Sequence, residues 1–450
     1  MSTLAPSRFV AVQGFPAPGE QVTEIVAGGP GFVAVGFADN PTPECPYSRD
    51  GRIWTSADGE RWARRDGDSL ADTYLGGVVV SGAALYAFGY VGVPGDCPVS
   101  DGFGNNVWRS TDGITWQQLT SGIGDENDAW NDVAASGNTL VAVGRFGFTD
   151  DDVLHGGVWT STNGVDWQVA SRPPATYDLV TVAALGGTVV AFGEDIADGP
   201  AWYSQDGGDT WQAGRIDSGY VPYSFDLIAA HDRFVLVTSS CCGVPMRTVG
   251  VALTSTDGRT WSTGSAPEAH FYHAEQVVSV PGAFVALSPA GETRLSSDGV
   301  SWRSGPAGPH LDQDTGFIQA AGAGSTGVVM VTNQSAAGGG PEVRAWFAPL
   351  REFSPGSWTQ PAVAAHDPVV GQSYAYRLYT HCGEEGTRVL MDGGIWLVDR
   401  VESTGRGFAN PEDRGTIILL DQNRARYESR RGGSILFERA ADPPPWPRCA

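Results

Sequence analysis

Lysine is absent from this chain of 450 residues, so all 28 basic residues are arginine, against 51 aspartates and glutamates. Without lysine, Schiff-base catalysis and lysine-dependent phosphate loops are excluded. The formal net charge is −23, and it is uneven: residues 1–360 hold 39 acids and 17 arginines, whereas residues 361–450 hold 12 and 11. An acidic front region argues against nucleic acids and anionic membranes as partners. It also keeps a large surface soluble.

Long apolar runs are missing as well. No run approaches the roughly 20 residues that span a bilayer, and no long stretch has apolar residues at helical spacing, so we expect little helix. The first residues, Met1–Ser7, do not resemble a signal peptide. Glycine is frequent, with 61 residues, and so is tryptophan, with 15. Many tight turns together with many large aromatic side chains favour an all-β chain of short strands.

The cysteines are few and none forms a CxxC pair, which excludes zinc-ribbon spacing. They are Cys45, Cys97, Cys241, Cys242, Cys382 and Cys449. The first two lie in matching loops of adjacent repeats and the last two near the C-terminus, so we expect the disulfides Cys45–Cys97 and Cys382–Cys449. The middle two are neighbours and form either a strained disulfide or two thiols. The cysteines favour an extracellular or cell-surface protein.

A short motif of the form Ser-x-Asp-Gly-x-x-Trp recurs along the chain. Its copies are Ser56–Trp62, Ser110–Trp116, Ser161–Trp167, Ser204–Trp211 with one extra residue, Ser255–Trp261 and Ser296–Trp302. The closing tryptophans lie 41 to 54 residues apart. This spacing is typical of one four-stranded propeller blade.

The chemistry of the motif predicts a structural role. Asp-Gly between two apolar runs is a strong hairpin signal, and the carboxylate can accept backbone N–H groups of its own turn. We expect this role for Asp58, Asp112, Asn163, Asp206, Asp257 and Asp298. Asn163 keeps the acceptor oxygen and loses the charge, which fits turn capping and would be odd for a catalytic or metal-binding carboxylate.

Strand-like runs surround each motif, and we name the four strands of a blade a to d. In one blade they are 132–135, 139–144, 158–161 and 167–170. A degenerate set at 327–331 and 343–347 lacks the Asp-Gly turn, and the run 8–12 can supply its missing strand. We therefore predict an all-β, seven-bladed propeller over residues 1–360 that the N-terminal strand closes. Six blades with an insertion are the alternative.

The last part of the chain, 366–450, breaks the repeat. It has strand-like runs at 373–380, 387–398, 415–420 and 434–439, separated by turn residues. Pro-rich segments flank it at 355–368 and 443–447. We predict a small antiparallel C-terminal β domain.

The six motif copies resemble the Asp box, or BNR repeat, of sialidase-like β-propellers. The resemblance implies the architecture and no single function, because the fold occurs in sialidases, other glycoside hydrolases, receptor ectodomains and photosystem assembly factors. Sialidases have an early Phe/Tyr-Arg-Ile-Pro segment, and the corresponding Ser7–Val10 does not match it. Sialidase activity is therefore not expected. The C-terminal region, around Tyr379–Gly383, looks like domains that end some actinobacterial secreted proteins.

The d-to-a and b-to-c loops share the face of a propeller that usually binds ligands. Here they are rich in aromatic and acidic residues, and the candidate binding residues are Trp130, Tyr177, Tyr220, Tyr223, His270, Tyr272 and His273. Aromatic rings beside carboxylates can stack on sugars or anchor a basic partner. A hydrolase could instead use two carboxylates across the channel mouth, with Asp132, Asp226 and Glu275 as candidates. Ordinary solvated turns are the third interpretation.

We expect a monomeric binding module, with a glycan or protein partner, rather than an enzyme; a glycoside hydrolase is the alternative. No cofactor is expected. The pair His270 and His273 alone is a weak pattern, and the run 150–152 lacks the spacing of a calcium loop, so no metal is expected either.

Overall fold

The computed structural model describes most of the repeat region and much of the C-terminal region. The described residues are 8–41, 48–66, 70–91, 105–124, 128–146, 155–170, 178–193, 201–217, 222–240, 249–263, 275–289, 291, 293–309, 311, 316–335, 341–353, 370–371, 373–379, 388–391, 394–403, 408 and 412–439. All six cysteines, and with them both predicted disulfides, lie outside these residues.

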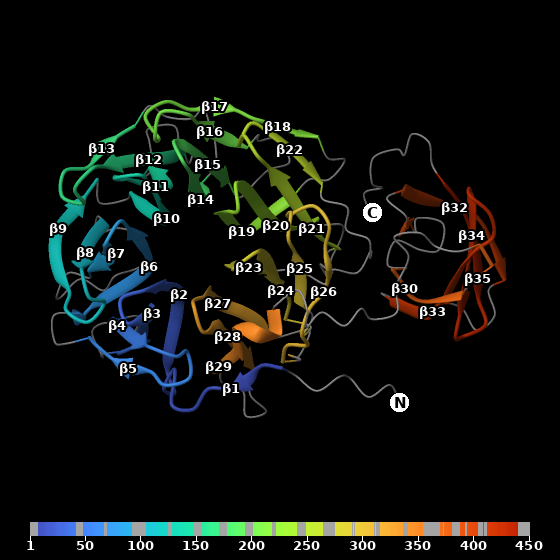
Figure 1. The fold of residues 1–450 in the computed structure, drawn as a ribbon, viewed down its shortest axis with the longest axis horizontal. Helices are drawn as coiled ribbons and strands as arrows, with labels where there is room; N and C mark the ends of the chain where they lie inside the picture. The colour runs from blue at the N-terminus through green and yellow to red at the C-terminus, as the bar shows by residue number, and fades with distance from the viewer. Residues whose placement is uncertain are drawn as a thin grey trace.

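The described strands before residue 354 form seven sheets, which are arranged as the blades of a β-propeller around a common axis (Figure 1). We number the blades 1 to 7 by their innermost strands. These are β2 (Glu20–Gly28), β6 (Thr73–Ser81), β10 (Ala129–Ser136), β14 (Leu179–Leu185), β19 (Pro222–Ala230), β23 (Gln276–Val280) and β27 (Phe317–Ala323).

Each innermost strand pairs with an antiparallel second strand, and a third follows. The second strands are β3 (Gly31–Asp39), β7 (Ala84–Val91), β11 (Thr139–Phe146), β15 (Thr188–Gly193), β20 (Arg233–Ser240), β24 (Ala283–Leu287) and β28 (Gly327–Ser335). The third strands are β4 (Arg49–Ser56), β8 (Asn105–Ser110), β12 (His155–Ser161), β16 (Trp202–Ser204), β21 (Val249–Ser255), β25 (Thr293–Ser296) and β29 (Pro341–Pro349).

Short strands complete the outer rim of the blades. They are β5 (Ala63–Arg64), β9 (Gln117–Ile123), β13 (Gln168–Val169), β17 (Gln212–Ala213), β22 (Thr260–Thr263), β26 (Arg303–Ser304) and β1 (Val10–Ala11). Strand β1 comes from the start of the chain and pairs with β29 of blade 7, with Val10 opposite Phe347. Nearby, the ring of Phe9 meets the ring of Phe353 edge-on at 6.0 Å. The two ends of the repeat region are thereby joined, which protects sheet edges that would otherwise be open.

Blade 5 has a feature that the sequence pattern does not predict. The connection from blade 4 forms β18 (Arg215–Asp217), which pairs in parallel with the outer strand β22. The sequence of β18 has no apolar alternation and no turn signal, so the strand could not be predicted from it. It forms because the chain runs past the outer strand β22 on its way from blade 4 to blade 5.

The predicted turn hydrogen bonds are present in the Ser-x-Asp-Gly-x-x-Trp segments. In the first copy, Asp58 Oδ1 accepts from the amides of Glu60 and Arg61 at 2.9 and 2.8 Å. Asn163 Oδ1 accepts from the two corresponding amides, both at 2.8 Å. In all six copies the tryptophan Nε1 donates to the carbonyl oxygen of the glycine three residues before it, at 2.8 to 3.1 Å. The motif therefore ties its own turn together.

The core lies between the faces of neighbouring blades. Val35 and Ile53 of blade 1 pack with Leu75 and Leu85 of blade 2 in one fully buried cluster. Similar clusters join the other blades. This double-sided burial explains why the second strands read as continuous apolar runs.

The C-terminal region forms a six-stranded antiparallel sheet in the order β30-β33-β34-β35-β32-β31. Its strands are β30 (Ser373–Tyr379), β31 (Arg388–Met391), β32 (Gly394–Ser403), β33 (Glu412–Leu419), β34 (Arg424–Ser429) and β35 (Ser434–Arg439). The predicted single strand 387–398 is wrong, because β31 and β32 are two strands of a hairpin in which Met391 lies opposite Gly394. The prediction also missed β34, whose arginines alternate with buried residues.

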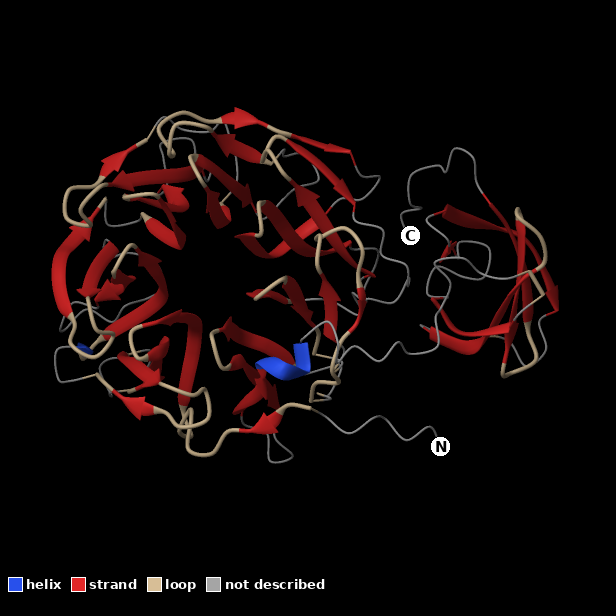
Figure 2. Cartoon of the chain, in the orientation of Figure 1, coloured by secondary structure: helices blue, strands red, loops and turns tan. Residues whose placement is uncertain are grey.

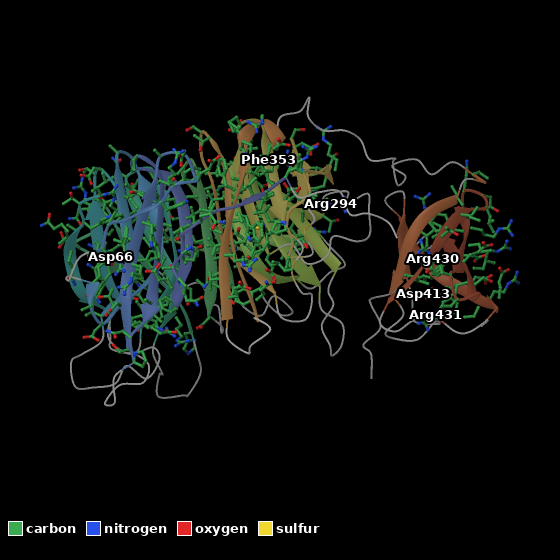
Figure 3. All side chains as sticks on the ribbon, turned by 90° about the horizontal axis from the view of Figure 1, so that it is seen from below. Asp66, Arg294, Phe353, Asp413, Arg430 and Arg431 are labelled. Carbon is green, nitrogen blue, oxygen red and sulfur yellow. The ribbon has the colours of Figure 1, made fainter. Side chains whose placement is uncertain are left out.

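Strands make up nearly all the regular structure (Figure 2), and a short 3-10 helix, η2 (Leu350–Phe353), follows β29. In the side view, Phe353 of η2 lies near one rim of the ring (Figure 3). Among the described residues, no helix has the length and apolar character needed to cross a membrane.

Candidate functional site

The three candidate catalytic carboxylates each bridge two blades. Asp132 lies at a β-bulge of β10, where its Oδ2 accepts from the amide of Val182 in blade 4 at 2.8 Å and from the hydroxyl of Thr181 at 3.2 Å. Its Oδ1 accepts from the amide of Val133 at 2.7 Å. Both oxygens of this carboxylate are therefore engaged by the fold.

Asp226 occupies the same bulge position in β19 and accepts from the amide of Val277 in blade 6 at 2.8 Å. Glu275, just before β23, accepts from the amide of Ile318 in blade 7. Sequence reasoning missed a fourth member of this set, Glu24, which lies at the bulge of β2 and accepts from the amide of Val78 in blade 2 at 2.7 Å. An acid directly before an apolar strand run would have been its signal. We call Glu24, Asp132, Asp226 and Glu275 the inner-strand acids.

Burial raises the pKa of three of these acids. It raises the pKa of Asp132 to about 6, although three hydrogen bonds to the carboxylate act in the opposite direction. Burial, together with the charge of Asp132, raises the pKa of Asp226 to about 7. Burial and the charges of the other two carboxylates raise the pKa of Glu24 well above its usual range. The three acids of blades 1, 3 and 5 therefore repel one another across the ring.

The innermost strands have no positive charge to offset this repulsion. All seven, over their described lengths, lack arginine, lysine and histidine. No group of three or more described His, Cys, Asp or Glu residues is arranged to hold a metal ion. Because each of them accepts from a peptide N–H group of the next blade, the inner-strand acids have the geometry of blade-to-blade hydrogen-bond acceptors.

Of the candidate binding residues, only Trp130 has a described side chain. It is 8% exposed and packs against Trp159 and Trp167, so the expectation of an exposed ring is not met at this position. Tyr177, Tyr220, His270, Tyr272 and His273 lie outside the described residues, as does the side chain of Tyr223.

Another set of side chains gathers where the innermost strands begin and the second strands end, on the face of the d-to-a and b-to-c loops. In blades 7, 1 and 2 the facing pairs there are Phe317 with Asn333, Gln21 with Phe37, and Tyr74 with Tyr90. We call these six residues the rim strip. Phe317 is 44% exposed and the other five are half-buried.

Contacts connect the rim strip from blade to blade. Asn333 Nδ2 donates to Gln21 Oε1 at 3.3 Å, and the Gln319 amide donates to the same oxygen at 2.6 Å. Between blades 1 and 2, the ring centroids of Phe37 and Tyr74 lie 5.1 Å apart. The rings of Tyr74 and Tyr90 then stack at 4.8 Å.

Glycine lets these strands approach each other. A Cβ atom on Gly36 would clash with the carbonyl oxygen of Gln21, and one on Gly89 would clash with that of Tyr74. The sequence signal that could have located the strip is therefore the pattern Gly-aromatic at the end of a second strand, Gly36-Phe37 and Gly89-Tyr90.

The charged groups beside the rim strip are paired. The Arg49 guanidinium lies 4.5 Å over the ring of Phe37, and its Nε is 3.5 Å from Asp39 Oδ1. Deeper in blade 1, Arg52 contacts Glu20 and Asp66 at 3.6 and 3.7 Å (Asp66 is labelled in Figure 3). These ion pairs balance the charges that neighbour the strip in blade 1.

The next blades differ at the same level of the ring. Arg145 stands at the position of Phe37 and Tyr90, and its Nη1 donates to Asp178 Oδ2 of blade 4 at 3.3 Å. On the described part of this face, the aromatic and amide pairs therefore lie in blades 7, 1 and 2, whereas the ion pair of Arg145 and Asp178 joins blades 3 and 4 at the same level.

No protein-family model matches the chain, and no curated protein matches it in sequence. Among solved structures, YCF48 bound to D1 peptide is similar at 12% identity, covering 77% of this chain and 98% of its own, with a TM-score of 0.45. The β-propeller domain of the Trilobed protease from Pyrococcus furiosus, at 12% identity, covers 75% and 97% with a TM-score of 0.44. An extracellular domain of a putative one-component system from B. thetaiotaomicron, at 10% identity, covers 97% and 48% with a TM-score of 0.47.

Proposed function

We propose that the protein is a binding module that acts outside the cell and presents the loop face of its propeller to a glycan or protein partner. The observation that carries this proposal is the rim strip. Phe317 is exposed and the other aromatic rings of the strip are half-buried, whereas rings such as those of Trp108 and Trp159 are buried in the clusters between blades. Partly exposed aromatic groups next to amides are typical of recognition surfaces.

The inner-strand acids support the same proposal, because they already accept hydrogen bonds from backbone amides of neighbouring blades. A general acid must reach its substrate, and Asp132 already accepts three hydrogen bonds from residues of the ring. One observation favours the second candidate, a glycoside hydrolase: the pKa of Asp226 is raised to about 7, as that of a general acid would be.

Two measurements on the purified chain separate these functions. The first is binding to immobilised glycan and peptide arrays, and the second is turnover of a fluorogenic glycoside panel. A ligand of either class that Phe317→Ala fails to bind supports the binding module. Turnover that disappears in a folded Asp226→Asn variant would instead assign a hydrolase. If folded protein shows no binding and no turnover, both functions are rejected.

A further inference from the structure

The rim strip combines flat rings at its ends with amides between them. Phe317 of blade 7 is the exposed end, and the stacked pair of Tyr74 and Tyr90 forms the end in blade 2. Pyranose rings present a C–H face that packs on aromatic rings and a rim of hydroxyls that both donate and accept hydrogen bonds. The order aromatic, amide, aromatic along the strip matches such a ligand.

The amides of the strip offer one donor and one acceptor. Gln21 Oε1 accepts from both Gln319 and Asn333, which leaves the Gln21 Nε2 group without a partner among the described residues. Asn333 uses its Nδ2 group in this contact, and its Oδ1 has no partner in the described part of the chain. A donor beside an acceptor satisfies a hydroxyl, which offers both functions.

The charges around the strip argue against an ionic ligand. Arg49 lies over the ring of Phe37 at 4.5 Å and is neutralised by Asp39 at 3.5 Å. The nearby ionic network of Arg52 with Glu20 and Asp66 is mostly buried and internally paired. A sialic acid, a uronic acid or a basic peptide bound here would therefore find that the described charged residues beside the strip are already paired with one another.

We infer that the rim strip binds a neutral carbohydrate. This inference rests on the proposed binding function and names its ligand class. The aromatic ends hold the C–H faces of sugar rings, and Gln21 and Asn333 bind a hydroxyl between them.

The test uses cello-, manno-, galacto- and xylo-oligosaccharides as neutral probes, sialylated and uronic-acid oligosaccharides as charged probes, and Arg-rich peptides as protein probes. The full chain is screened against all three sets, and the best neutral oligosaccharide is titrated by calorimetry. Phe317→Ala, Tyr90→Ala and Gln21→Glu should each weaken binding by about tenfold or more. The control Val169→Ala, on the outer strand β13 and 55% exposed, should bind as the wild type does.

Binding should also be insensitive to salt between about 0.05 and 0.5 M, because no ion pair is formed. Selective binding of a charged glycan or a peptide that Phe317→Ala abolishes would overturn this inference and keep the proposed function. Neutral-sugar binding that none of the three variants weakens would place the ligand elsewhere and overturn it too. Absence of binding to every probe would reject the proposed function as well. Because Phe317 is exposed, its variant should fold normally, which circular dichroism can verify.

Discussion

Asp226 gives a sharp test of how the inner-strand acids act in the fold. Its carboxylate accepts from the amide of Val277 across the interface of blades 5 and 6, at 2.8 Å. Burial raises its pKa from 3.8 to about 7. The substitution Asp226→Asn keeps an acceptor oxygen for that amide and removes the ionisation. Asp226→Ala removes both the acceptor and the charge.

The sign of the pH effect follows from the direction of the pKa change. A carboxyl group that is more basic in the folded state binds its proton more tightly there than in the unfolded chain. Its contribution to stability is complete below about pH 4 and is lost as the pH rises through about 7. A pKa of about 7 in place of 3.8 corresponds to about 4 kcal/mol at most. Because the residue is half-buried and solvent screens part of the charge, we expect about 1–3 kcal/mol.

Urea unfolding at several pH values measures this difference. At about pH 3 the wild type and Asp226→Asn should unfold at nearly the same urea concentration, because the carboxyl group is then largely protonated in both the folded and the unfolded chain. At about pH 8 the Asn variant should unfold at a higher concentration. Asp226→Ala should be less stable than Asp226→Asn by about 1–3 kcal/mol at either pH, because the Val277 amide loses its acceptor. A lower midpoint for Asp226→Asn than for wild type at pH 8 would refute the reasoning, since the ionised carboxylate would then be stabilising.

Three further predictions concern other parts of the molecule. Asp298→Ala should lower the free energy of unfolding by about 0.5–2 kcal/mol, because it removes the acceptor for the amides of Val300 and Ser301; Asp298→Asn should be nearly neutral, and a large loss in it would show that the charge matters. Gly89→Ala should destabilise the chain by about 1–3 kcal/mol and also disturb Tyr74, because the added methyl group would clash with the Tyr74 carbonyl oxygen. Ligand binding should therefore fall in this variant. The control Gly144→Ala makes the same kind of clash in blade 3, away from the rim strip, and should still bind the ligand. Tyr427→Phe should cost about 1–3 kcal/mol in the C-terminal sheet, because the buried Asp413 (labelled in Figure 3) loses a 2.8 Å hydrogen bond; denaturation that is unchanged from wild type would contradict this.

The turn chemistry could be predicted from the sequence because it is local. Ser, Asp, Gly and Trp of one motif contact one another within a few residues, so their order along the chain already determines the hydrogen bonds that Asp58 and Trp62 make. The replacement of aspartate by Asn163 was informative for the same reason, since the retained oxygen accepts the same two amides.

The roles of the inner-strand acids could not be predicted in this way. Asp132 and Asp226 stand out in the sequence as acids near aromatic loops, which suggested catalysis as one possibility. Their acceptor role depends on amides 50 and 51 residues away in the next blade. A β-bulge in each inner strand turns the carboxylate toward that neighbour, and no local pattern reports the distance between two blades.

The sequence by itself determined the repeat, its turns, the buried second strands and the acidity of the front region, because each depends on residues that are close along the chain. The tertiary structure decided which side chains meet across blades: Gln21 with Asn333, 312 residues apart, and Phe37 with Tyr74. These contacts exist because the ring brings the start of each inner strand beside the end of the second strand in the neighbouring blade. The candidate site therefore depends on how the blades pack against one another, whereas the strands and turns of each blade can be predicted from the repeated sequence motif.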